Sequence, residues 1–388
     1  MKTEQAVKLV TLFETSSTLS ASSTQSHNAH SFYVPDGVTK LHLFFRYHPD
    51  LLEDTDRAKT IVQTTVEFYE EQKEMDTIEK YLPLRNLLTV SVDDPEQFRG
   101  ACHRWASSQQ LFLCEDDASP GLLRGPIRQG LWTVTISSHA IVTETCTYEL
   151  QIQGEMESGH YPWKKKMSLQ NFQAGDRNIS LYPTEKKERR WAACELHAHT
   201  FHSDGKQTLT EMAKEAKRLG IEYVAVTDHN TTSPLQEKET VEKETGVKII
   251  NGLEWTTFYG HMLTLGYKTA QYTDWRRIGP TNLKKGLKEV HELGALAGIA
   301  HPFRIGNPIG TGCHWEFEVD NIMDFDYFEV WNGEAPSTRL YNQNAYQLWT
   351  DLLTGGHRIP AVSGRDWHEN RGNDPLAAIT YVHVPKKR

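Results

Sequence analysis

The sequence predicts a two-domain protein with a mostly β amino-terminal domain and an α/β carboxyl-terminal domain. The chain of 388 residues is too long for one ordinary domain and fits two. Up to about residue 183, apolar and polar residues alternate in short stretches separated by turn residues, which is typical of β-strands. From Trp191 onward, short apolar runs alternate with amphipathic stretches of helical length. This second pattern indicates strands and helices in turn around a parallel sheet, either open or closed into a barrel.

The amino-terminal region, residues 1–183, is expected to form a β-sandwich or a jelly roll. Alternating apolar residues predict strands within 40–49, 86–92, 130–136 and 147–154. Turn signals such as PDG at 35–37 and SPG at 119–121 separate these stretches. The stretch at 60–82 has a helical pattern instead, unlike the alternating strand pattern of the rest of this region.

The second domain is expected to span residues 191–388, after a solvated linker at 184–190 that is charged and has no apolar side chain. Amphipathic stretches that each end in glycine predict helices at 208–220, 281–294 and 338–356. Thr208 and Glu211 have the spacing of a capping box at the start of the first helix. Short apolar runs predict strands at 222–227, 247–252, 261–267, 295–300, 325–331 and 358–364.

Composition and charge disfavour several classes of protein. A net charge of −9 disfavours a protein that holds extended nucleic acid by its phosphates, but it leaves room for a small anionic substrate. No apolar run approaches the roughly 20 residues that a membrane span needs, and the start of the chain, with Glu4, is a poor secretory signal. The five cysteines form no CxxC pair, which favours reduced thiols in a cytoplasmic protein. The sequence is compatible with a homo-oligomer and does not define the oligomeric state.

Residues able to bind metal ions follow the predicted strands of the second domain. His197 and His199 alternate with apolar residues, so a strand would point both imidazoles to one side. The carboxyl ends of parallel strands share one face, and further candidates lie at such ends: Asp228, His229, Glu254, His301, Asp366 and His368. His261 starts its strand instead, but a strand antiparallel to its neighbour would return it to the same face.

This repeated placement predicts a metal site. Burying so many imidazoles and carboxylates without partners would cost several kcal/mol in unsatisfied polar groups. Neutral imidazole nitrogen and carboxylate oxygen are ligands of divalent metal ions, and a bound metal would remove that cost.

In this order, the motifs resemble those of the PHP (polymerase and histidinol phosphatase) superfamily of metallohydrolases. The matching segments are HAH at 197–199, HSDG at 202–205, TDHN at 227–230, AHP at 300–302 and SGRDWH at 363–368. NGLEW at 251–255 and FEVWNG at 328–333 resemble the carbaryl-hydrolase-like branch, and the resemblance covers about residues 191–384. It implies a distorted (β/α)7 PHP barrel with two or three divalent metal ions: zinc, manganese or iron.

The resemblance also implies a set of metal ligands. The first metal position would take His197, His199, Glu254 and Asp366. Glu254 would bridge to a second position, completed by His261 and His301. A third position would take Asp204, His229 and His368. The nucleophile would be a metal-bound hydroxide held near Glu254 and Asp366, and no GxSxG or P-loop motif competes with this reading.

Five further residues are expected to support the site. Asp228 and Glu329 are expected beside the ligands, with Asp228 orienting an imidazole. Arg304, Arg365 and His202 are expected to contact substrate, because a guanidinium suits a phosphate oxygen and His202 lies inside the HSDG motif.

We therefore expect a metal-dependent phosphoesterase acting on a small phosphomonoester or phosphodiester, such as a nucleotide. A carbamate or carboxyl ester hydrolase with the same metal centre is the first alternative, since the similar branch includes such activity. A non-catalytic metal-binding scaffold is the alternative from another class. The intact ligand set favours an enzyme over the scaffold.

Overall fold

The computed structural model describes residues 7–69, 78–157, 189–268, 274–373, 375 and 379–385. The predicted linker at 184–190 lies mostly outside these residues, and its last two, Arg189 and Arg190, begin a strand. The predicted domain limits at 183 and 191 therefore stay predictions. In the part of the chain that is described, no helix has the length and apolar character needed to cross a membrane.

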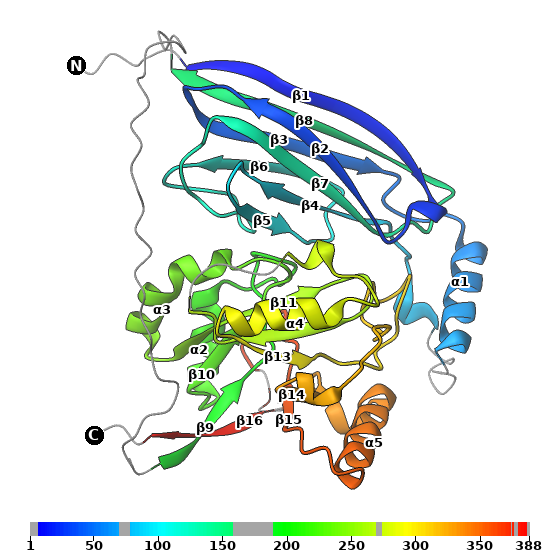
Figure 1. Cartoon of the computed structure of the whole chain (residues 1–388). Helices are drawn as coiled ribbons and strands as arrows, with labels where there is room; N and C mark the ends of the chain where they lie inside the picture. Colours follow the sequence, from blue (N-terminus) through cyan, green and yellow to red (C-terminus); the bar gives the residue numbers. More distant parts are fainter. Residues whose placement is uncertain are drawn as a thin grey trace.

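The amino-terminal region is a sandwich of two four-stranded antiparallel sheets (Figure 1). One sheet has the order β1 (Val7–Ser20), β8 (Thr145–Glu157), β3 (Val38–His48) and β6 (Ser108–Cys114). The other has the order β2 (Ser26–Val34), β7 (Gly130–Ala140), β4 (Leu87–Asp93) and β5 (Phe98–Cys102). Alternate residues of facing strands, such as Leu41 and Leu43 of β3 and Trp132 and Val134 of β7, share one apolar core. The mostly β prediction and its four strands are confirmed.

Helix α1 (Thr55–Phe68) is the exception in this region. Asp54 caps its start by accepting a hydrogen bond from the backbone N–H of Arg57 at 2.9 Å. The helix covers the first part of the stretch at 60–82 that has a helical pattern in the sequence. Its buried face, with Val62 and Val66, packs in one apolar cluster with Ile305 of the second region.

The second region is built on an eight-stranded sheet with the order β15-β14-β13-β12-β11-β10-β9-β16. The strands are β9 (Arg189–Glu195), β10 (Tyr223–Val226), β11 (Lys248–Thr256), β12 (His261–Leu265), β13 (Leu296–Ile299), β14 (Tyr327–Asn332), β15 (Ala361–Gly364) and β16 (Thr380–Pro385). The backbone N–H of Ser363 in β15 donates to Thr380 Oγ1 of β16 at 2.8 Å, so the sheet nearly closes on itself. That the domain is a (β/α)7 barrel, with seven strand–helix units, stays a prediction.

Most neighbouring strands in this sheet are parallel, as the sequence predicts. Strand β12 runs antiparallel to both β11 and β13, which confirms the reversed strand expected at His261. Strand β16 is antiparallel to β9. The parallel strands therefore present their carboxyl ends, and β12 its amino end, at the same edge.

Helices α2 (Leu209–Arg218), α3 (Lys238–Thr245), α4 (Leu283–Glu292) and α5 (Leu340–Thr354) pack against this sheet, and three of them match the predicted stretches. The capping box of Thr208 and Glu211 is present at the start of α2. Short 3₁₀ helices lie at Ala21–Ser23, Ser233–Glu237, Trp275–Arg277, Ile322–Asp324 and Pro336–Thr338.

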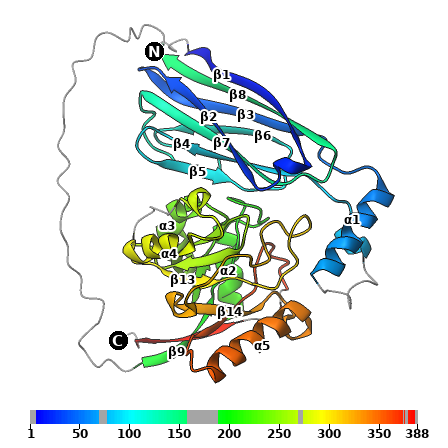
Figure 2. The ribbon, with the colours of Figure 1, turned by 45° about the vertical axis from the view of Figure 1, so that its right-hand side comes forward.

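The sandwich lies against one end of the second region, with α1 at its side (Figures 1 and 2). Arg276 bridges the two by donating to both carboxylate oxygens of Asp93 at 2.7 and 2.8 Å. The Thr231 hydroxyl donates to the carbonyl of Gly121 at 2.8 Å, close behind the predicted site residues 227–230. The amino-terminal region thus contacts the loops that carry the candidate functional residues.

Candidate metal centre

Ten buried or partly buried side chains gather at the edge of the sheet where the strand ends meet; the nine predicted metal ligands are among them, with Cys313. We call this cluster the candidate metal centre. Its side chains belong to His197, His199, Asp204, His229, Glu254, His261, His301, Cys313, Asp366 and His368. His301 and Asp366 adopt backbone φ values of +27° and +53°, which non-glycine residues rarely do and which concentrate at functional sites. The convergence that the sequence predicts is therefore present.

One corner of the centre consists of His199, Asp204, His229 and His368, whose ligand atoms all lie within 4.8 Å of one another. Oδ1 of Asp204 is 3.2 Å from Nε2 of His368 and 3.4 Å from Nε2 of His229. Three of these residues are the set that the family resemblance assigns to a third metal position.

A second corner contains His197, His199, Glu254 and Asp366, the set assigned to the first metal position. Oδ1 of Asp366 lies 3.3 Å from Nε2 of His197 and 3.0 Å from Nε2 of His199. Oε2 of Glu254 lies 3.4 Å from the same two nitrogens. Two imidazoles thus face two carboxylates, as ligands of one ion do.

Glu254 also faces the third corner, through its other oxygen. Oε1 of Glu254 is 3.0 Å from Nδ1 of His261 and 3.1 Å from Nε2 of His301. One oxygen of the carboxylate therefore faces each pair of histidines, and Oε2 also lies 2.9 Å from Nδ1 of His229. Contact of one carboxylate with histidines on both sides is the arrangement of a bridging ligand.

The donor set fits divalent metal ions. Within the described residues, several of its buried atoms have no hydrogen-bond partner: Nε2 of His197, both ring nitrogens of His199, Oδ1 of Asp204, Oε2 of Glu254 and Nδ1 of His301. Each buried polar atom left unsatisfied costs about 1–3 kcal/mol. Metal coordination would satisfy those that face one another, namely Nε2 of His197, Nε2 of His199, Oδ1 of Asp204 and Oε2 of Glu254. Imidazole nitrogen and carboxylate oxygen are suited to zinc, manganese and iron, and each neutral imidazole offers one nitrogen.

Electrostatics keeps His199, His261 and Glu254 in the protonation states that bind metal. Burial lowers the pKa of His199 to about 3, helped by His368 and His229. Burial likewise lowers the pKa of His261 to about 4. Burial alone would raise the pKa of Glu254, but His229, His197 and His261 hold it well below its ordinary value. Neutral imidazole and ionised carboxylate are the ligating forms.

For His197, His229 and His368, burial alone would lower the pKa, but nearby carboxylates raise it well above the ordinary value in His197 and His229 and to about 9 in His368. These three imidazoles would therefore release a proton when a metal ion binds.

Glu329 and Asp228 surround the cluster in different ways. Oε1 of Glu329 accepts from Nδ1 of His197 at 2.9 Å, and Oε2 accepts from the backbone N–H of His301 at 2.9 Å. Glu329 thus orients two candidate ligands. Asp228 differs from the expectation, because its carboxylate accepts from the backbone and hydroxyl groups of Thr200 and Ser203 rather than from an imidazole. Its position next to that turn makes it a support for the loop before Asp204.

The residues expected to contact substrate have different surroundings. Arg304 forms an ion pair with Asp366, and 39% of its side chain is exposed. The Arg365 guanidinium is buried and lies 4.6 Å from the centre of the Trp367 ring. His202 is buried, with Nδ1 2.7 Å from Ser233 Oγ and Nε2 3.1 Å from Glu237. Of these three side chains, Arg304 is the one open to a ligand.

Three residues that sequence reasoning missed also belong to this region. Buried Glu195 accepts from the backbone N–H groups of His197 at 2.9 Å and Arg365 at 3.0 Å, and burial raises its pKa to about 7. Cys313 lies beside His261 and His301. His103 of the sandwich packs against His229. Glu195 is the last residue of β9 and lies two residues before His197, so the HAH motif follows the strand rather than forming part of it. Glu195 was visible in the sequence, whereas the other two residues approach through long-range packing.

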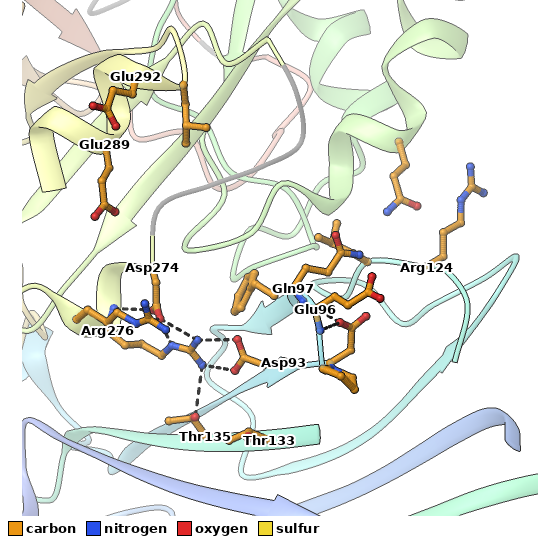
Figure 3. Close-up of a pocket in the computed structure, with 17 residues that line it drawn as sticks. Asp93, Glu96, Gln97, Arg124, Thr133, Thr135, Asp274, Arg276, Glu289 and Glu292 are labelled. Atoms are coloured by element: carbon orange, nitrogen blue, oxygen red, sulfur yellow. Dashed lines mark hydrogen bonds and ion pairs between the residues drawn. The ribbon is translucent and has the colours of Figure 1, made fainter. Parts of the chain in front are cut away.

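A cavity of about 1030 Å³ lies elsewhere, between the sandwich and the second region (Figure 3). Arg276 crosses it to reach Asp93 and Thr135, while Glu289 and Glu292 line it from α4. None of the residues lining this cavity is a predicted metal ligand. This cavity and the candidate metal centre are therefore separate features of the molecule.

Comparison with known proteins agrees with the motif analysis. The family model described as PHP domain matches residues 195–301. An uncharacterized protein of Methanocaldococcus jannaschii is 31% identical over 156 residues, which are 36% of this chain and 81% of that protein. A 3′,5′-nucleoside bisphosphate phosphatase of Chromobacterium violaceum is 31% identical over 120 residues, which are 29% of this chain and 41% of the relative.

A solved structure of a two-domain protein containing a predicted PHP-like metal-dependent phosphoesterase, from Bacteroides vulgatus, is also similar. It has 18% sequence identity and a TM-score of 0.39, with 54% of this chain and 63% of that chain covered. The match of the family model to the segment that carries most candidate ligands, and the coverage of most of the archaeal relative at 31% identity, identify the family. This chain belongs to the PHP domain family.

Proposed function

We propose that this protein is a metal-dependent phosphoesterase that hydrolyses a small phosphomonoester or phosphodiester. The observation that carries the proposal is the position of Glu254, with Oε2 toward His197 and His199 and Oε1 toward His261 and His301. A carboxylate shared in this way is suited to a centre of adjacent metal ions. The name of the Chromobacterium violaceum relative, a nucleoside bisphosphate phosphatase, supports a phosphate ester as substrate and a nucleotide as one candidate.

The three corners of the candidate metal centre would hold two or three ions of zinc, manganese or iron. Such ions lower the pKa of a coordinated water toward neutrality and neutralise charge that develops on the substrate. The residues of this chain have the supporting roles. Glu329 fixes the ring orientation of His197, and Glu195 holds the backbone of His197 and Arg365 in register.

We assign substrate binding first to Arg304. Its guanidinium is partly exposed and is already fixed beside the candidate centre by Asp366. A planar guanidinium can donate two hydrogen bonds to a phosphate oxygen pair, and charge-assisted bonds of this kind are the strong ones. Arg365 and His202 are held by neighbouring groups, so in this proposal they shape the walls of the site.

The proposal is tested with chelator-stripped protein that is reloaded with manganese or zinc. We expect reloaded protein to hydrolyse p-nitrophenyl phosphate or bis-p-nitrophenyl phosphate, and stripped protein to be inactive. Arg304→Ala should raise KM about 10- to 100-fold, the loss expected for a hydrogen bond to a charged group. The KM of Arg304→Lys should lie between those of the parent protein and Arg304→Ala. Arg277 is a control, because 79% of its side chain is exposed, and Arg277→Ala should have the KM of the parent protein.

Absence of turnover with every mono- and diester, in fully metallated protein, would contradict the proposal. Hydrolysis of neutral carbamates or aryl carboxyl esters, with no effect of Arg304→Ala, would instead assign the chain to the carbaryl-hydrolase-like activity. Lack of both activities in protein that binds metal would leave the non-catalytic scaffold.

A further inference from the structure

The candidate metal centre contains a thiol that the family's motifs do not include. Cys313 belongs to the glycine-rich segment 305–313, which follows the AHP motif and runs beside the centre. One ligand atom each of His261, His301 and Cys313 lie within 4.8 Å of one another. The thiol is partly buried. The thiol therefore lies beside two histidines that Oε1 of Glu254 also contacts.

His301 is a deeply buried member of this corner. The residue is 2% exposed, and its Nε2 lies 3.1 Å from Oε1 of Glu254. Nδ1, on the other side of the ring, has no hydrogen-bond partner in the described part of the chain. A buried imidazole that turns Nε2 toward a carboxylate is suited to a metal ion at that nitrogen, and Cys313 lies beside the same ring.

The backbone before Cys313 is shaped to bring the thiol close. The carbonyl of Thr311 lies 3.2 Å from Nε2 of His261, so the segment rests directly on a candidate ligand. Gly312 has φ +73°, and a Cβ at this position would lie 2.1 Å from the carbonyl oxygen of Thr257. Only glycine fits such an approach, and this places the next residue, Cys313, at the histidines.

The amino-terminal region holds the other side of the same segment. The ring of Tyr69, which follows α1, lies 4.6 Å from the ring of His314. A Cβ on Gly306 would come within 2.2 Å of the Tyr69 hydroxyl oxygen. Ile305 packs with Val62 and Val66 of α1. The segment is therefore clamped between α1 and His261, rather than left as a free surface loop.

We propose that Cys313 is a thiolate ligand of the metal ion held by His261, His301 and Glu254. This inference rests on the metal centre of the proposed function and adds a soft sulfur donor to one of its positions. A Cys, two His and one carboxylate select zinc or ferrous iron over magnesium or manganese. On binding, the thiol proton leaves to solvent and the sulfur electron pair is donated to the ion.

With this ligand, the metal positions of the centre would have different roles. A zinc ion with four protein donors has no open position, as in structural zinc sites. The Cys313 corner would then hold a firmly bound ion, while substrate would approach the corners of His199, Asp204 and His368. Metal preference would consequently differ between corners of one site.

The experiment uses the full chain, stripped with chelator and reloaded with cobalt(II), whose bond to a thiolate gives a near-ultraviolet charge-transfer band. We expect this band in the parent protein and in Cys114→Ser, which removes the other partly buried thiol. Cys313→Ser should lose the band and keep the visible bands of bound cobalt. Its zinc affinity should fall at least about tenfold, with manganese affinity little changed.

Each outcome decides the inference. Visible cobalt bands without the charge-transfer band in the parent protein would overturn Cys313 as a ligand while the metal centre stands. Survival of the band in Cys313→Ser would do the same. If the parent protein binds no cobalt, the metal centre of the proposed function fails, and the thiolate ligand fails with it. The parent measurement needs no variant, so a poorly folded Cys313→Ser leaves the test intact.

Discussion

The imidazole of His103, from the sandwich, and the imidazole of His229, from the candidate metal centre, lie with their ring centres 4.7 Å apart. His103 follows β5 and is buried, and His139 of β7 packs behind it at 4.7 Å. Burial lowers the pKa of His103 well below its ordinary value, helped by His229. The sandwich thus provides a neutral, buried wall for a cluster whose candidate ligands all come from the other region.

His103→Ala should weaken zinc binding about 10- to 100-fold, because residues that position a ligand typically contribute this much. Removing the ring takes away one packing face of His229, which faces Asp204 at 3.4 Å. His229 is then held at Nδ1 by Thr256 at 2.6 Å and Glu254 at 2.9 Å. Competition with a chromophoric chelator measures the affinity. His103→Gln, which keeps much of the volume, should recover part of the loss.

The matched control for this substitution is His42→Ala. His42 belongs to the other sheet of the sandwich, and its ring pairs with Glu155. Equal zinc affinity for His103→Ala, His42→Ala and the parent protein would show that the contact with His229 has no role in metal binding.

The contrast between predicted and missed residues has a physical cause. His197, His199 and Asp366 were predictable because parallel strands must place their carboxyl ends at one edge. His261 was predictable because a tight turn at 259–260 reverses the chain. These inferences use local pattern and one rule of topology, so they also predict the convergence of the candidate ligands.

Contacts between distant segments were beyond that reasoning. His103 reaches the centre only because two regions dock, and nothing in the sequence near Cys102 or Arg104 indicates the docking. Cys313 approaches because Gly312 and Tyr69 shape its segment from opposite sides. Asp228 was correctly placed near the site, but the partners of its carboxylate depend on the fold of a turn, which spacing does not define.

Metal removal should destabilise the second region. Ions that bind only the folded state stabilise it by about 2.7 kcal/mol at a free concentration 100 times Kd, and their loss leaves the buried nitrogens of His197 and His199 without partners. Calorimetry with and without chelator should show a lower Tm that zinc restores. The chelator effect should shrink in Glu254→Gln, which loses the bridging charge, and persist in His291→Ala, a helix-surface control. A Tm that chelator leaves unchanged would count against the centre.

Acid should weaken the docking of the sandwich through His27. Its ring stacks on Phe258 at 4.6 Å and meets the edge of Trp275 at 5.1 Å. Burial lowers the pKa of His27 to about 4 from 6.5, helped by Arg276. Because the folded pKa is the lower one, the unfolded chain binds more protons between these values. The contribution of His27 is therefore complete above pH 6.5 and is lost as pH falls toward 4.

The difference between parent and His27→Gln isolates this effect, since titration of the candidate metal ligands is common to both. Between pH 7 and pH 4.5, the free energy of unfolding of the parent protein should fall by about 1–2 kcal/mol more than that of the variant. This figure is reduced from the full effect of the pKa shift because His27 is partly exposed. Urea denaturation at both pH values measures it, and His42→Gln serves as control. Parallel losses in parent and His27→Gln would disprove the role of His27.

Gly364, the last residue of β15, should tolerate no side chain because it lies against the candidate metal centre. A Cβ at this position would lie 2.4 Å from Cβ of His197 and 2.9 Å from Oε1 of Glu329. Gly364→Ala must therefore displace a candidate ligand or the carboxylate that orients it, at a cost of about 1–3 kcal/mol for overpacking.

Zinc affinity should fall together with stability in Gly364→Ala, since the same displacement moves His197. Urea denaturation and chelator competition give the two quantities on one preparation. Gly279→Ala is the matched control, because a Cβ at Gly279 meets nothing within 4 Å. If Gly364→Ala were as stable as Gly279→Ala and bound zinc equally well, the packing of β15 against His197 would be looser than the close approach at Gly364 requires.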